Sequence, residues 1–61
     1  MADIEIVKRR DRASMFSKTS VGRKWMLDNL PEHGPVFTFD ANLVEDMVAS
    51  LQKDDIEVEV I

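Results

Sequence analysis

Two periodicities divide the second half of the chain into a helix between two strands. Five apolar residues recur at intervals of three and four positions: Leu43, Val44, Met47, Val48 and Leu51. This spacing places one apolar stripe on a helix over residues 43–53. Apolar β-branched residues then alternate with glutamates over residues 56–60, and an aromatic segment over residues 36–39 follows Gly34 and Pro35. Both segments are typical of half-buried strands.

A helix that joins two strands predicts a βαβ unit over residues 36–61. If the two strands are neighbours in one sheet, they run parallel with a right-handed crossover. An antiparallel arrangement with another strand between them is the alternative. At the start of the helix, Asn42 with Glu45 three residues later is a candidate capping pair, and Asp40 is a second candidate start.

A shorter helix is predicted over residues 21–29. Thr19 and Ser20 are favourable N-cap residues, and Pro31 prevents the helix from continuing. Gly22 weakens this helix by about 1 kcal/mol relative to Ala. A close neighbour that leaves no room for a Cβ atom is one reason for a glycine at this position.

Two further strands are predicted upstream. Residues 13–17 form one, with Met15 or Phe16 facing inward, and the other rests on three apolar residues: Ile4, Ile6 and Val7. The charged residues 8–12 then form the turn between them, although they include no Gly, Pro or Asn. The alternative is one helix over residues 4–16, because Lys, Arg, Ala and Met all tolerate a helix.

Together these elements predict an α+β fold, a small two-layer sandwich in the order ββαβαβ. A three- or four-stranded sheet carries two helices on one face, and residues 1–61 form a single small domain. The predicted core combines the two C-terminal strands, the helix stripe and the single tryptophan: Trp25, Phe37, Phe39, Val44, Met47, Val48, Leu51, Ile56, Val58 and Val60.

Composition narrows the class of protein further. A hydrophobic share of 44% is ordinary for a globular domain, and the absence of cysteine excludes disulfides and thiolate metal sites. The apolar runs are far shorter than the roughly 20 residues of a membrane span. No charged stretch followed by an apolar run opens the chain, so we expect no secretory signal and no membrane contact. The expected location is the cytoplasm.

Charge is distributed unevenly along the chain. Residues 1–24 carry a formal charge of +4 and residues 25–61 a charge of −8, which gives the net charge of −4. Seven of the eight basic residues lie within residues 8–24: Lys8, Arg9, Arg10, Arg12, Lys18, Arg23 and Lys24. Such a distribution favours two surfaces of opposite sign, one for a polyanion and one for a cationic partner or a second copy of the chain.

A sequence motif spans the second predicted helix. Thr19, Gly22, Arg23 and Trp25 form a Thr-x-x-Gly-Arg-x-Trp core, which is followed by the aromatic strand and by the helix start Val-Glu-Asp-Met-Val at residues 44–48. Over residues 15–53 this arrangement resembles small uncharacterised proteins of bacterial plasmids and phages. The resemblance implies a bacterial origin and membership of a mobile element, and it implies no activity, site or ligand.

The sequence contains no pattern typical of catalysis. His33 is the only histidine and lacks further His or Cys ligands at metal-binding spacing, so we expect it at an exposed loop tip. No serine lies in a G-x-S-x-G elbow, and the adjacent carboxylates at residues 45–46 and 54–55 are typical of a solvated helix and turn. No phosphate-binding glycine loop is present. We therefore expect no enzyme, no cofactor and no metal.

The remaining function is binding. We expect a small accessory or regulatory protein that acts by protein–protein association, with an unidentified partner or with itself as a homodimer. The alternative is nucleic-acid binding through the seven basic residues, with Phe16 as an aromatic among them. The absence of a helix-turn-helix or RNP motif, together with the acidic net charge, places this alternative second. A solvated turn with no binding role is the simplest interpretation of the basic segment.

Overall fold

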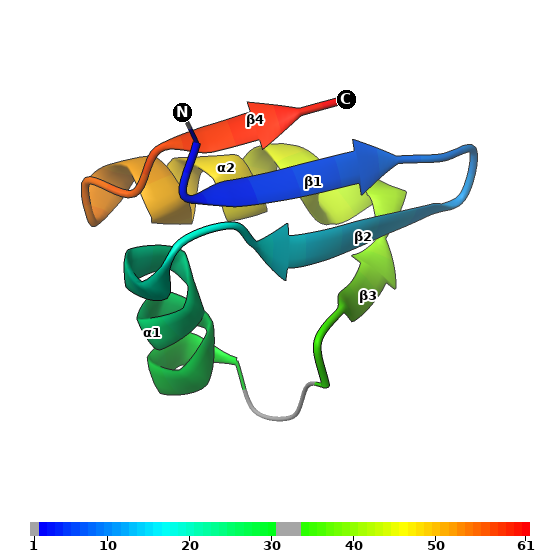
Figure 1. The fold of residues 1–61 in the computed structure, drawn as a ribbon. Helices are drawn as coiled ribbons and strands as arrows, with labels where there is room; N and C mark the ends of the chain where they lie inside the picture. The colour runs from blue at the N-terminus through cyan, green and yellow to red at the C-terminus, as the bar shows by residue number, and fades with distance from the viewer. Residues whose placement is uncertain (1, 31–33) are drawn as a thin grey trace.

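The computed structural model describes residues 2–30 and 34–61, which fold into a four-stranded sheet with two helices (Figure 1). The elements follow the predicted order, with a 3-10 helix added before the second α-helix: β1 (Ile4–Lys8), β2 (Arg12–Ser17), α1 (Ser20–Asn29), β3 (Phe37–Asp40), η1 (Ala41–Leu43), α2 (Val44–Lys53) and β4 (Val58–Val60). The predicted α+β class and two-layer architecture are confirmed.

The N-terminal hairpin occupies the centre of the sheet, whose strand order is β3-β2-β1-β4. β2 runs antiparallel to both β1 and β3, whereas β4 runs parallel to β1. β3 and β4 are therefore parallel but lie at opposite edges, and α2 connects one edge to the other behind the sheet (Figure 1). The two strands of the candidate βαβ unit thus run parallel but are not neighbours, because the hairpin inserts both of its strands between them, and the antiparallel alternative is not found either.

The hairpin forms without the usual turn residues. β1 and β2 pair from Ile4 opposite Ser17 to Lys8 opposite Ala13, so the alternative of a single helix over residues 4–16 is wrong. Arg9 N–H donates to the Arg12 carbonyl over 2.8 Å to close the turn. Within the described part of the chain Asp55 alone among non-glycine residues has a positive φ. The turn therefore uses backbone conformations open to any residue, and its lack of glycine is no obstacle.

The core lies between the sheet and the two helices. Its largest fully buried side chains are Ile4, Ile6, Met15 and Leu51. Five predicted core residues are buried, namely Trp25, Phe39, Val44, Leu51 and Ile56, and four more pack against the core while partly exposed, namely Phe37, Met47, Val48 and Val58. The prediction for Val60 is wrong: this residue is 45% exposed, because it lies at the end of an edge strand.

Gly22 allows α1 to approach β1 closely. A Cβ atom at this position would overlap the Asp3 carbonyl oxygen and lie 2.9 Å from Ile4 Cγ1. The predicted lack of room beside Gly22 is thus confirmed. Asp3 also ties three segments together, because its carboxylate accepts from Thr19 Oγ1 over 2.7 Å and from Glu57 N–H over 3.4 Å. Thr19 in turn caps α1 by accepting from Gly22 N–H over 3.2 Å.

The two ends of α2 differ from each other in how they are capped. Leu43 precedes the helix without a side-chain cap, so the predicted Asn42–Glu45 capping pair is wrong. Asp40 instead caps η1 by accepting from Asn42 N–H over 2.9 Å, in agreement with the second candidate start. At the C-terminal end, Ile56 N–H donates to the Leu51 carbonyl while Asp55 adopts a φ of 60°, which is a Schellman motif without glycine.

Candidate functional site

The seven basic residues predicted to bind polyanions lie in two groups at opposite ends of the sheet. Lys8, Arg9, Arg10 and Arg12 belong to the β1–β2 turn and its flanks, whereas Lys18, Arg23 and Lys24 lie after β2 and on α1. All seven are exposed. Because β1 and β2 separate the groups, they lie roughly 17 Å apart, the length of a five-residue strand. The seven basic residues are therefore close together in the sequence but do not form one surface patch.

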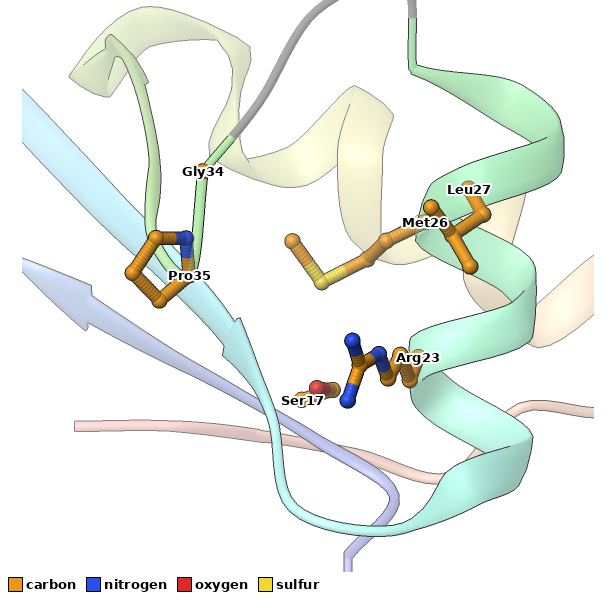
Figure 2. Close-up of a pocket in the computed structure, with 6 residues that line it drawn as sticks. All are labelled: Ser17, Arg23, Met26, Leu27, Gly34 and Pro35. Atoms are coloured by element: carbon orange, nitrogen blue, oxygen red, sulfur yellow. The ribbon is translucent and has the colours of Figure 1, made fainter.

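Two members of the second group have specific surroundings. Lys18 Nζ lies 3.4 Å from Glu5 Oε1, and the Glu5 side chain is only 11% exposed. Arg23 lines a pocket of about 500 Å³ together with Ser17, Met26, Leu27, Gly34 and Pro35 (Figure 2). Neither residue is therefore simply part of a continuous basic surface.

The pocket exists because β3 is shorter than β2. β3 pairs with residues 12–15 of β2, so Ser17 at the end of β2 has β1 on one side but no pairing with β3 on the other. α1 forms one wall and the Gly34–Pro35 segment forms the other, as Figure 2 shows. The Arg23 side chain extends from α1 toward Ser17, and the Met26 thioether extends into the same space (Figure 2). The result is a mainly apolar depression with one cationic group.

The second candidate surface is the open face of the sheet. Side chains alternate between the two faces of a strand, and the helices pack against the face that carries Ile4, Ile6 and Met15. Neither helix of the described residues covers the other face, and we call it the open face. It carries the alternate residues of each strand: Glu5, Val7, Ser14, Phe16, Thr38 and Glu59. Backbone hydrogen bonds of Ile61 with Ile6 and Lys8 extend the β4 ladder and bring Ile61 onto the same face, beside Val7.

The open face combines apolar side chains with separated charges. Val7 and Phe16 are half-buried although no helix covers them, and Ile61 is 64% exposed. At one end Arg12 lies opposite Asp40 and next to the basic turn. At the other end Glu5 and Glu59 are direct neighbours on parallel strands, a like-charge arrangement that destabilises a sheet unless cations compensate. Lys18 compensates for Glu5.

Sequence reasoning did not identify Val7 and Ile61 as surface residues with a role. The signal was present in the pairs Ile6-Val7 and Val60-Ile61, because two adjacent apolar residues in a strand cannot both face the core.

Other predicted sites contribute little to a functional surface. His33 lies outside the described residues. Ser20 begins α1, whereas Thr19 provides its cap, and Asp54 accepts a hydrogen bond from Trp25 Nε1 over 2.8 Å. Across residues 2–30 and 34–61 no three His, Cys, Asp or Glu side chains are grouped as metal ligands. A shallower pocket between α1 and α2 is bordered by Trp25 and Asp54, whose polar atoms bind each other.

Comparison with known proteins returns no relative. No family model matches the sequence, and no curated protein or solved structure matches it significantly. The resemblance to plasmid and phage proteins accordingly stays a prediction. None of the helices in the described ranges has the length and apolar character needed to cross a membrane.

Proposed function

We propose that this protein is a non-enzymatic accessory or regulatory protein that acts by protein–protein association through the open face, and that its partner is a second copy of the chain. The observation that carries this proposal is the apolar content of the open face. Val7, Phe16 and Ile61 lie on the side away from the helices, where they add nothing to the packing of the core. Apolar side chains grouped on an exposed surface favour an interface.

The charges at the two ends of the open face favour a second copy as the partner. On the open face itself the basic turn marks one end, and Glu59 marks the other, where Lys18 pairs with Glu5. A two-fold axis that lies in the plane of the contact, perpendicular to the strands, places the basic end of one copy over the acidic end of the other. The surface is thus complementary to itself, as an isologous dimer requires. Arginines from the partner would lie close to Glu59, whereas Glu5 is already compensated by Lys18.

The size of the open face limits the strength of association. Four strands about 4.8 Å apart and roughly 17 Å long present a flat area of about 300 Å². Standard interfaces bury about 800 Å² of accessible surface per partner. We therefore expect a reversible dimer with a dissociation constant on the order of 10–100 µM, formed at high local concentration.

Sedimentation velocity and light scattering over a range of protein concentrations test the proposal. The apparent mass should rise from 7.0 kDa toward twice that value, and added salt should weaken the dimer. Phe16→Glu and Ile61→Glu should each keep the protein monomeric. Val21→Glu is the matched control, because Val21 is an equally apolar residue, 55% exposed, on α1 rather than on the open face. A monomer at every concentration and ionic strength would contradict the proposal.

A further inference from the structure

The pocket beside α1 contains a cationic group that has no partner within residues 2–30 and 34–61. Across the described residues, the Arg23 guanidinium forms neither an ion pair nor a hydrogen bond, unlike Lys18, which pairs with Glu5. Its side chain nevertheless extends into the pocket rather than away from it (Figure 2). A guanidinium carries five N–H donors in a planar fork and readily binds an anion in two-point fashion. The arrangement therefore favours an anionic ligand.

The walls of the pocket restrict the kind of anion. Met26, Leu27 and Pro35 present apolar surface, and Leu27 is 60% exposed on the pocket side of α1. Ser17 adds one hydroxyl group beside the guanidinium. A phosphate dianion favours several cations or a row of backbone N–H groups, whereas one guanidinium matches the single charge and planar geometry of a carboxylate. The volume of about 500 Å³ lies within the range of small-molecule pockets.

We propose that this pocket binds a carboxylate that carries a small branched apolar group. The Arg23 guanidinium holds the carboxylate through two parallel hydrogen bonds, and the Ser17 hydroxyl donates a third. The apolar group of the ligand contacts Met26, Leu27 and Pro35. This chemistry is shared by a free branched carboxylic acid and by the C-terminal leucine of a peptide. The site uses no residue of the open face, so its existence is independent of dimer formation.

Amide chemical shifts measured during a titration with 4-methylpentanoate test the proposal. Saturable shifts are expected at Ser17, Arg23 and Gly34, with a dissociation constant on the order of 1 mM for so small a probe. The uncharged isostere 4-methylpentanamide should cause no saturable shift. Arg23→Gln should weaken binding by about tenfold or more. Arg23→Lys keeps the charge but loses the two-point geometry of the guanidinium, so its affinity should lie between those of Arg23→Gln and the native protein.

Lys24→Gln is the matched control. It removes the same charge from the next residue of α1, which is exposed and does not line the pocket, so binding should be unchanged. Equal losses in Lys24→Gln and Arg23→Gln would overturn the proposal, because they would indicate general electrostatic attraction. Equal binding of the acid and the amide, or tighter binding of inorganic phosphate, would overturn it as well.

A second titration with acetyl-alanyl-leucine identifies the source of the carboxylate. Tighter binding of this peptide than of 4-methylpentanoate assigns the pocket to the C-terminus of a peptide, and the reverse order assigns it to a free acid. Either order at the same three amides supports the proposed chemistry. No saturable shift with either probe at tens of millimolar would exclude it.

Discussion

Gly22→Ala tests the closest contact in the fold. In α1 this glycine faces the start of β1, and an added Cβ would overlap the Asp3 carbonyl oxygen and approach Ile4 Cγ1 to 2.9 Å. Because the clash involves backbone rather than the flexible end of a side chain, rotamer changes alone do not relieve it. Either α1 or the first residues of β1 must move.

The loss of stability in Gly22→Ala depends on the contacts that this movement disturbs. Overpacking of a tight contact costs about 1–3 kcal/mol. A shift of α1 also weakens the hydrogen bonds that Lys18 N–H and Thr19 Oγ1 donate to Asp3, each worth about 1 kcal/mol. The better helix propensity of alanine stabilises the variant by about 1 kcal/mol and offsets part of this loss. The net loss of about 2 kcal/mol is a large part of the roughly 3–9 kcal/mol expected for a domain of this size.

Thermal unfolding followed by circular dichroism measures the effect. For a small domain, a loss of 2 kcal/mol lowers the melting temperature by about 8–16 °C. Gly34→Ala is the matched control, because a Cβ at Gly34 meets no atom within 4 Å and no glycine in the described residues has a positive φ. The free energy of unfolding of this control should rise by about 0.4–1 kcal/mol, because alanine lowers the conformational entropy of the unfolded chain. If Gly22→Ala raised the melting temperature as Gly34→Ala does, the close approach of α1 to β1 would be refuted.

Two further predictions concern the end of α2 and the basic turn. Asp55→Gly should raise the free energy of unfolding by about 0.5–1 kcal/mol in urea titrations, because Asp55 has a φ of 60°. Asp54→Gly should lower it instead, since Asp54 has a negative φ and accepts from Trp25 Nε1; the opposite order would contradict the role of the Schellman motif. If the turn binds duplex DNA through Arg9, Arg10 and Arg12 alone, the log–log salt dependence should have a slope of about −2.7. A slope near −6 would require both basic groups, and undetectable binding at low salt would exclude nucleic acid.

The sequence predicted the elements of this fold more accurately than their arrangement. Helical spacing located α2 to within one residue, because its apolar residues fall on one stripe, and alternation located β4. β3 begins one residue later than predicted, at Phe37. Local patterns of this kind report which side of an element is buried. They do not report which strand lies beside which.

The order of the strands depends on contacts between distant segments. Ile4 and Ile6 were assigned to a strand but left out of the predicted core, although both are fully buried. Both lie on β1, which has a strand on either side, whereas the edge strand β4 leaves Val60 exposed. The tie from Asp3 to Thr19 and Glu57 joins positions 16 and 54 residues apart, and no periodicity encodes such a contact.

The candidate sites likewise depend on contacts between distant segments, which sequence patterns do not report. The clustering of basic residues in the sequence suggested one surface, but a hairpin sends Arg10 and Lys18 to opposite ends of the sheet. The pocket at Arg23 depends on where β3 stops pairing with β2, which only the register reveals. Sequence adjacency is therefore a poor guide to surface adjacency in a fold built on a hairpin.

An uncovered sheet face is unavoidable in a two-layer domain of 61 residues, because two short helices can cover only one side. The existence of the open face therefore says nothing about function, whereas the residues on it do. Antiparallel and mixed sheets with one solvated side usually place polar residues there. Thr38, Ser14 and Glu59 follow this rule, whereas Val7, Phe16 and Ile61 depart from it without serving the core. Because these three side chains do not contribute to the core, binding to a partner is the best explanation for them. Phe16→Glu should therefore weaken association more than it lowers the free energy of unfolding.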